Sequence, residues 1–129
     1  MVIHASAEDY LEVILVLTER LGLVRSIDIV NELGYSKPSI SVAMKKLREN
    51  GYIEMDNEGY ITLLPPGMEV AQRIYRRHKL LKSFLISLGV DEATAAEDAC
   101  KIEHCISEET FVMLAKHVEQ DHVNELGTN

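Results

Sequence analysis

The stretch KPSISVAMKKLRENGYIEMDNEGYITLLPPG, residues 37–67, changes its hydrophobic period half-way along. Up to Gly51 the apolar residues recur every three or four positions, which is typical of a helix with one buried face. After Gly51 apolar and polar residues alternate in YIEM and in YITLL, and the turn-forming DNEG lies between them. This pattern predicts a β-hairpin, which Pro65 and Pro66 end because proline has no backbone N–H to donate.

Two helices are expected before this stretch. SAEDYLEVILVLTERLG, residues 6–22, is amphipathic, with Ser6 as its candidate N-cap, and SIDIVNELG, residues 26–34, predicts a short second helix. Ser36 can cap the third helix, with Pro38 in its first turn. The order helix, helix, tight turn, helix, hairpin is that of a winged helix-turn-helix, whose third helix lies in the major groove of DNA. The alternatives at this point are an unrelated three-helix unit and a small interaction module.

The second half of the chain is predicted to be helical throughout. A long helix is expected over about 67–88, and further helices follow Asp91 and Ser107, two good N-caps. These helices carry more apolar surface than three helices bury alone, so we expect a homodimer, the commonest oligomer. The alternative is that the apolar stripes complete a monomeric core. The residues expected at the dimer face are Leu80, Leu81, Phe84, Leu85, Phe111, Leu114 and Val118.

Composition and charge exclude some classes of protein. Apolar residues make up 47% and charged residues 26%, as in a soluble globular protein. No stretch approaches the roughly 20 apolar residues of a membrane span, and the N-terminus lacks a signal peptide, so we expect a cytoplasmic protein with reduced cysteines. A net charge of −8 speaks against nucleic acid at first sight. Basic residues nevertheless concentrate in one window, as Arg25, Lys37, Lys45, Lys46 and Arg48.

The stretch CKIEHC, residues 100–105, is a candidate metal site. Cys100, Glu103 and His104 follow the i, i+3, i+4 spacing that places three side chains on one face of a helix, within reach of one ion. A Glu-His pair on a helix is more often solvated surface, and that interpretation stays open.

Three further residues of ligand type occur on other predicted helices. Asp9 and Glu12 are spaced i, i+3 in the first helix, and His78 lies on the long one. Taken singly, the carboxylates could complement the helix dipole, and a lone histidine is more often a packed or surface residue. Together with the CKIEHC stretch they make six carboxylate, imidazole and thiolate donors, enough for two divalent ions per chain.

At these residues the sequence resembles the diphtheria toxin repressor and manganese transport regulator family of metal-dependent repressors. EDYLE in the first helix, YRRHKLL in the long helix and IEH after an acidic turn occur in the family's order and spacing. The resemblance covers almost the whole chain. It implies a metal-dependent transcriptional regulator that binds double-stranded operator DNA as a homodimer and represses metal-uptake genes. It also implies a winged helix-turn-helix DNA-binding domain over 1–66, then a helical metal-binding and dimerisation domain over 67–129.

The resemblance also implies the metal ligands. The residues that match the family's ligand positions are Asp9, Glu12, His78, Glu103 and His104. The sixth candidate, Cys100, stands where the iron-sensing branch has a cysteine and the manganese-sensing branch a carboxylate, so the set combines both branches. Lys82 stands where relatives have an acidic residue, which argues against the accessory site of the iron branch. Because a thiolate favours softer ions, we expect Fe(II) first and Mn(II) next.

For DNA contact the resemblance supports the start of the third helix. The residues expected to contact bases there are Ser36, Lys37, Pro38, Ser39 and Ser41, and those expected at phosphates are Arg25, Lys45 and Lys46. A solvated helix face is the alternative for the two lysines. An enzyme, for example a metallohydrolase, is the competing class, but no substrate pocket or spare general base is recognisable. A metal-storage module is the third candidate, and the hairpin and basic window speak against it.

Overall fold

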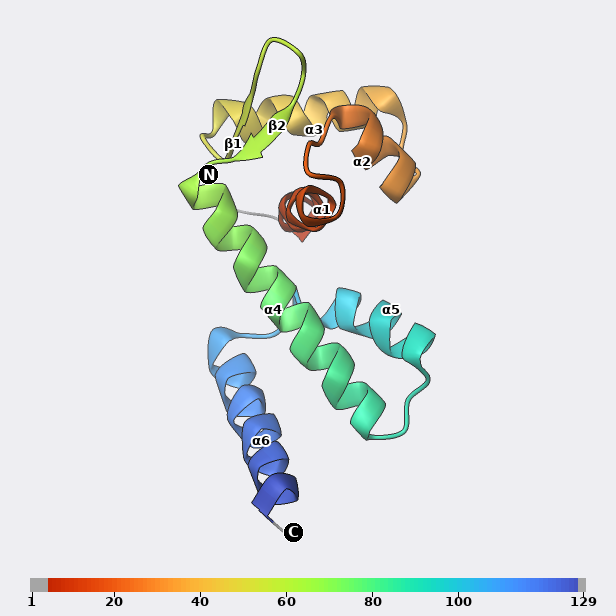
Figure 1. Ribbon diagram of the computed structural model, residues 1–129, viewed down its shortest axis with the longest axis vertical. Coiled ribbons are helices and arrows are strands. Elements are labelled where there is room, and N and C mark those ends of the chain that lie inside the picture. Colours follow the sequence, from red (N-terminus) through yellow and green to blue (C-terminus); the bar gives the residue numbers. More distant parts are fainter. Residues whose placement is uncertain (1–4, 128–129) are drawn as a thin grey trace. The chain divides into compact units, whose positions relative to one another are not determined.

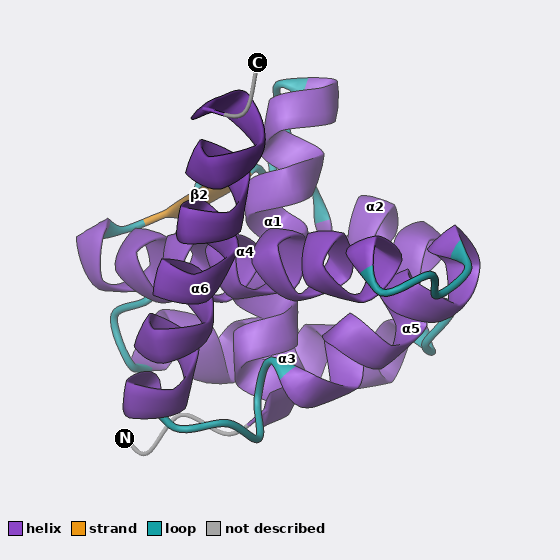
Figure 2. Cartoon of the chain, turned by 90° about the horizontal axis from the view of Figure 1, so that it is seen from below, coloured by secondary structure: helices purple, strands orange, loops and turns teal. Residues whose placement is uncertain are grey.

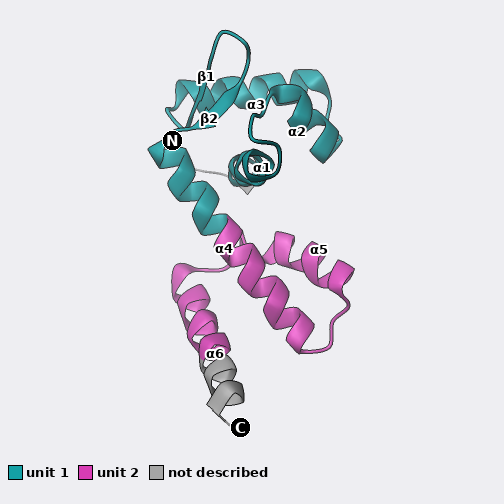
Figure 3. Cartoon of the chain, viewed as in Figure 1, with its two compact units in different colours: residues 1–74 teal, residues 75–129 magenta. Residues whose placement is uncertain are grey.

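The chain is mainly α-helical, as the sequence predicts (Figures 1 and 2). The computed structural model describes residues 5–127, with side chains from 6 to 119. Its elements in chain order are α1 (Ala5–Leu21), α2 (Ser26–Leu33), α3 (Lys37–Glu49), β1 (Ile53–Met55), β2 (Ile61–Leu63), α4 (Pro65–Ser87), α5 (Glu92–Ile102) and α6 (Glu108–Gly127). The chain forms two compact units, unit 1 over 1–74 and unit 2 over 75–129 (Figure 3).

Unit 1 is a winged helix-turn-helix. Helices α1, α2 and α3 pack on one another, and Figure 1 shows α1 end-on with α2, α3 and the hairpin on one side of it. Strands β1 and β2 pair antiparallel, with Ile53 opposite Leu63. The hairpin is tied to the rest of the unit because Ile61 N–H donates to the carbonyl of Val24 at 2.7 Å. The core of the unit is formed by Leu11, Ile14, Leu17, Ile29, Ile40, Met44, Leu47 and Ile53.

The helix ends agree with the expected caps in most places. Ser36 Oγ accepts from Ser39 N–H at 3.3 Å and so caps α3. Ser6 was expected to cap the first helix, and this expectation is wrong, because α1 already includes Ala5. The long helix likewise begins at Pro65 rather than near 67. Prolines fit there because the N–H groups of a helix's first turn have no intrahelical partner.

Unit 2 contains residues 75–87 of α4 together with α5 and α6. The expected caps are present: Asp91 Oδ2 accepts from Ala93 N–H, and Ser107 Oγ accepts from Thr110 N–H, each at 3.1 Å. Of the residues expected at a dimer face, Leu81 is buried within the chain, whereas the other six are only half-buried. In the described part of the chain, no helix combines the length and the apolar character that crossing a membrane requires.

Gly67 is a point where the fold admits no side chain. A Cβ at this position would collide with the backbone carbonyl of Tyr52 and would also touch the side chain of Leu11 at 3.4 Å. We expect Gly67→Ala to lower the free energy of unfolding by about 1–3 kcal/mol, because the collision is with backbone and cannot be relieved by a rotamer change. Thermal unfolding should show a Tm lower by several degrees. The exposed Glu69→Ala on the same helix is the control and should leave Tm nearly unchanged; equal shifts in both variants would contradict the argument.

Candidate metal centre and DNA-contact surface

Unit 2 buries one carboxylate between two imidazoles. The Glu103 side chain is 0% exposed, and its Oε2 lies 2.9 Å from His78 Nδ1. Its other oxygen, Oε1, lies 3.4 Å from His104 Nε2 and makes no hydrogen bond to the described residues. A buried carboxylate oxygen without a hydrogen-bond donor is costly unless a cation or another donor satisfies it. We therefore expect a positive group or a hydrogen-bond donor next to Glu103 Oε1.

The end of α5 places these side chains. Helix α5 ends at Ile102, Glu103 is its C-cap residue with helical backbone angles, and His104 belongs to the turn that follows. The expectation that His104 shares a helix face with Cys100 is therefore wrong, because the helix ends first and the turn brings the imidazole to Glu103. Cys100 is helical and exposed, and its Sγ lies within 4.8 Å of a Glu103 carboxylate oxygen.

Arg77 holds the segment between α5 and α6 in place. This arginine is only 8% exposed, and it donates to the carbonyl oxygens of Glu103 at 3.2 Å and Ile106 at 3.1 Å. It also donates to Glu108 Oε2 at 2.6 Å, and its guanidinium lies 5.2 Å from the centre of the Phe111 ring. Sequence reasoning missed Arg77, because an arginine next to His78 carries no local signal that distinguishes a buried donor from a surface charge.

The donor types found in unit 2 are those that divalent transition metals take in proteins. They comprise one carboxylate, two imidazoles and one thiol, and together they offer the oxygen, nitrogen and sulfur ligands that Mn, Fe, Co and Zn take in proteins. An ion pair of Glu103 with a protonated imidazole would use the same contacts. Among the residues that the structure describes, none donates a hydrogen bond to the buried Glu103 Oε1, and a bound cation would explain this oxygen better. Lys82, expected to disfavour an accessory site, lies with its Nζ 3.6 Å from Glu92 Oε1.

Two of the acidic residues expected as ligands lie in α1 of unit 1. Asp9 and Glu12 are both half-buried and one helical turn apart. Burial raises the pKa of the neighbouring Tyr10, and the charges of Tyr35 and Asp9 raise it further. The preceding carboxylate, Glu8, forms an ion pair with Arg73 at 2.9 Å.

The residues expected to contact DNA are all exposed on unit 1. Most of them lie on α3 or at its N-cap, and Lys45 forms an exposed ion pair with Glu49 at 3.9 Å. Arg25 lies at the start of α2, and its guanidinium stacks 4.2 Å from the centre of the Tyr60 ring beside the hairpin. The basic window of the sequence therefore belongs to the surface of the winged unit.

Comparison with known protein families gives one match for the winged unit and one for the helical part that follows it. Residues 3–61 match the N-terminal DNA binding domain of the iron dependent repressors. Residues 65–128 match the metal binding and dimerisation domain of the same family. This chain belongs to the iron-dependent repressor family. The regulator is thus a metal-dependent, DNA-binding transcriptional regulator with a dimerisation domain, and its relatives are regulators rather than enzymes.

Individual relatives and structures support this assignment. The regulator is 36% identical over 117 residues to an uncharacterised helix-turn-helix-type transcriptional regulator of Methanocaldococcus jannaschii, covering 89% of this chain and 94% of that relative. It is 36% identical over 104 residues to the transcriptional regulator MntR of Salmonella typhimurium, covering 81% and 66%.

Among solved structures, a manganese-dependent transcriptional repressor in complex with manganese has a TM-score of 0.80 and 29% identity, covering 88% of this chain and 52% of that one. The IdeR protein of T. acidophilum has a TM-score of 0.78 and 26% identity, covering 92% and 55%. The regulator thus spans about half the length of these solved proteins.

The hydrogen bonds of Arg77 yield a test of its role. We expect Arg77→Met to lower the free energy of unfolding by roughly 3 kcal/mol, because the carbonyls of Glu103 and Ile106 lose a buried donor. The matched control is Glu108→Gln, which removes only the charge of the exposed partner and should cost less than about 1 kcal/mol. Urea unfolding of the metal-free protein measures both. A loss in Arg77→Met no larger than in Glu108→Gln would show that the two carbonyls do not depend on the arginine.

Proposed function

We propose that this regulator binds operator DNA when it holds a divalent metal and that it represses genes for metal uptake. The observation that carries the proposal is the buried Glu103 between two imidazoles in a chain whose other unit is a winged helix-turn-helix. Because its proposed target is genomic DNA, we propose that the regulator works in the cytoplasm. We place the boundary between its DNA-binding and dimerisation domains at residues 66 and 67, in α4; the two family matches end at 61 and begin at 65.

We propose six metal ligands. Four come from unit 2 (His78, Cys100, Glu103 and His104) and two from α1 (Asp9 and Glu12). Family membership and donor chemistry support this set, which is large enough for two divalent ions per chain. Three of the six are carboxylates, so their mutual repulsion opposes any arrangement that gathers them. A bound divalent cation supplies the positive charge that offsets this repulsion and thereby links the DNA-binding and dimerisation parts.

The identity of the metal is a finer proposal. The relatives include regulators named for manganese, such as the manganese-bound repressor structure, and the family is named for iron. A carboxylate-rich set suits Mn(II), whereas the thiol of Cys100 shifts the preference towards Fe(II) or another softer ion. We propose Fe(II) as the favoured ion and Mn(II) as the second.

We propose that α3 contacts the bases. Its N-terminal residues Ser36, Lys37, Pro38, Ser39 and Ser41 are exposed, as base-contacting residues must be. The exposed cations Arg25, Lys45 and Lys46 would bind phosphates, which fix the position of the helix without selecting sequence. Two such units in a homodimer would occupy two half-sites of one operator.

The buried carboxylate gives the most direct test of metal dependence. Binding of a fluorescent operator duplex should require Fe(II) or Mn(II) and should disappear when a chelator is added. Glu103→Gln keeps the size of the side chain but removes its charge, so it should weaken metal activation by roughly tenfold or more. The exposed Glu109→Gln in the first turn of α6 is the control and should behave as the wild type. If the metal-free protein binds DNA with the same affinity, metal does not control this regulator.

Cys100 gives a test of metal preference. Cys100→Glu replaces the thiol with a carboxylate and should raise the response to Mn(II) relative to Fe(II) and Zn(II), because Mn(II) prefers oxygen ligands. Anaerobic titration of DNA binding with each ion measures the order of response. Cys105→Glu, at the other exposed cysteine, is the matched control and should leave the order unchanged. An unchanged order in Cys100→Glu would mean that the thiol is not a ligand.

A further inference from the structure

The winged unit contains a cavity between α1 and α3. Its volume is about 510 Å³, within the roughly 300–1,000 Å³ of small-molecule sites in proteins. Helix α1 supplies Ala7 and Tyr10 to its lining, and α3 supplies Val42, Ala43 and Leu47. Both helices belong to unit 1, so the cavity is formed within one compact unit. It is large enough for an organic molecule with one or two rings.

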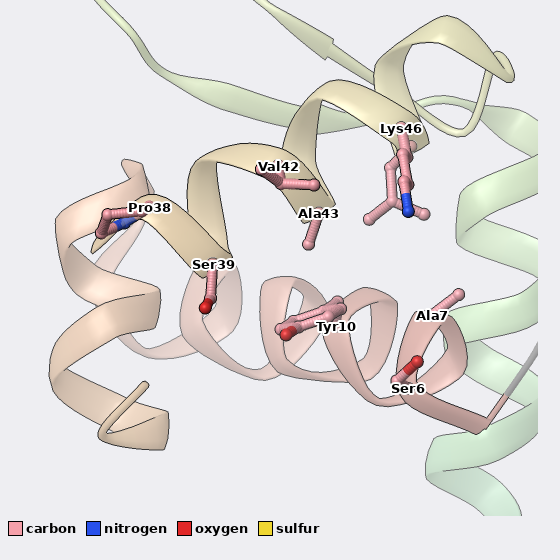
Figure 4. A pocket seen from close by; sticks show the side chains of 9 residues that line it. Ser6, Ala7, Tyr10, Pro38, Ser39, Val42, Ala43 and Lys46 are labelled. Atoms are coloured by element: carbon pink, nitrogen blue, oxygen red, sulfur yellow. The ribbon is translucent and has the colours of Figure 1, made fainter. Parts of the chain in front are cut away.

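Small side chains leave this space open. Figure 4 shows Ala43 pointing from α3 towards the ring of Tyr10, and Ala7 lies further along α1 on the same side. A longer side chain at Ala43 would fill the gap between the two helices. The apolar body of a ligand could therefore lie between Ala43 and the tyrosine ring, and a flat ring suits this position because aromatic pairs attract one another beyond their burial.

One end of the cavity is positively charged. Lys46 is the only charged residue of the nine that line it, and Figure 4 shows its amine on the side of α3 that faces α1. The preceding Lys45 pairs with Glu49, whereas Lys46 has no ion pair with any residue that the structure describes. The cavity thus offers one cation that is available to an anionic group.

The other polar groups of the lining do not oppose an anion. They are the hydroxyls of Ser6, Tyr10 and Ser39. Burial, together with the charges of Tyr35 and Asp9, raises the pKa of the Tyr10 hydroxyl, so this group stays neutral near neutral pH. Ser39 Oγ accepts a hydrogen bond from the Ser36 hydroxyl at 2.9 Å, which leaves the proton of Ser39 available to donate.

This combination selects one class of ligand. A single lysine balances one negative charge, and the largely apolar lining gives a phosphate or another small hydrophilic ion few further donors. We propose that the cavity binds a small aromatic carboxylic acid, with its ring between Tyr10 and Ala43 and its carboxylate at Lys46, and that the bound acid releases the operator.

Release follows from the residues that the two ligands share. Lys46 is proposed to bind a DNA phosphate and Ser39 to contact a base, and both also line the cavity. One amine cannot serve the acid and the phosphate at once, so the acid and the operator compete. Release of DNA therefore rests on the proposed function, whereas binding of the acid does not. The acid would be a second effector, acting on the winged unit without removing the metal.

The first experiment measures binding without DNA. The probe is 2-naphthoate, a flat monocarboxylate without a second group that could chelate metal, and its uncharged counterpart is 2-naphthamide. Each is titrated into the full metal-free chain, and amide chemical shifts are followed by NMR. We expect saturable shifts at the start of α1 and along α3, with an affinity in roughly the millimolar range for a probe of this size. The acid should bind about fivefold more tightly than the amide, because a partly exposed ion pair contributes at most a factor of this order.

The charge of Lys46 is tested by one variant and a matched control. In Lys46→Gln the acid and the amide should bind equally, because the cation that distinguishes them is gone. Arg48→Gln removes the same charge from the same helix, but Arg48 does not line the cavity and lies with an Nη atom 3.9 Å from Met55 Sδ. This control should keep the fivefold preference for the acid.

The space beside Ala43 is tested in the same way. Ala43→Phe should abolish saturable binding of both probes, because its ring occupies their position. Ala93→Phe places the same side chain at an exposed position on α5 and should bind both probes as the wild type does. Circular dichroism and Tm verify that the variants fold, and the comparison of acid with amide in the wild type needs no variant.

The second experiment measures release. An operator duplex selected from a random pool by the metal-loaded wild type is labelled, and its affinity is measured by fluorescence anisotropy at fixed salt and metal. At saturation 2-naphthoate should weaken operator binding at least fivefold. In Ala43→Phe the same concentration should leave whatever operator affinity that variant has unchanged, which excludes loss of metal to the probe as the cause.

Three results would overturn the inference: no saturable shifts, or shifts away from α1 and α3; equal affinity of the wild type for acid and amide; or an operator affinity that saturating 2-naphthoate leaves unchanged. Failure of the metal-loaded wild type to select any DNA would instead overturn the proposed function, and the release of DNA with it, while the NMR titration would still decide whether the cavity binds the acid.

Discussion

The packing of unit 2 depends on the contacts of one buried carboxylate, that of Glu103. Its two oxygens face imidazoles from different elements, His78 on α4 and His104 after α5. A buried negative charge holds such a position only when positive groups or donors surround it. The end of α5 and the middle of α4 are therefore joined through one charged group, and whatever satisfies that group also fixes the two elements together.

Arg77 extends this constraint to α6. Arg77 directly precedes His78 in the chain. It donates hydrogen bonds to the carbonyl of Glu103 and to the carboxylate of Glu108, in the first turn of α6. Residues 65–128 match a domain that both binds metal and dimerises. Because one arginine contacts both the turn that carries Glu103 and the start of the helix that follows, the turn cannot move far without disturbing α6. These shared hydrogen bonds place the turn that carries Glu103 and the start of α6 in one network.

Much of the fold was predictable because its signals are local. The change of period at Gly51, the cap at Ser36 and the caps at Asp91 and Ser107 each depend on a few neighbouring residues, and the structure confirms them. The candidate site was harder to predict from the sequence than the fold. The spacing of CKIEHC assumes a helix that continues to His104, and where a helix ends depends on tertiary contacts as well as on propensity. The role of Arg77 could not be predicted for a similar reason. Its three hydrogen-bond partners lie 26 to 31 residues away in the chain.

The distribution of charge reconciles an acidic protein with a DNA partner. The chain has a formal net charge of −8, so long-range attraction to phosphates is weak and depends on the few exposed cations near α3. Contacts of neutral side chains with base edges are hardly screened by salt, but they act only at short distance. A winged unit whose charge attracts DNA only weakly therefore gains most of its discrimination between sequences after docking rather than during approach. For such a protein the geometry of the docked winged unit matters more than the total charge, because only close contacts distinguish one DNA sequence from another.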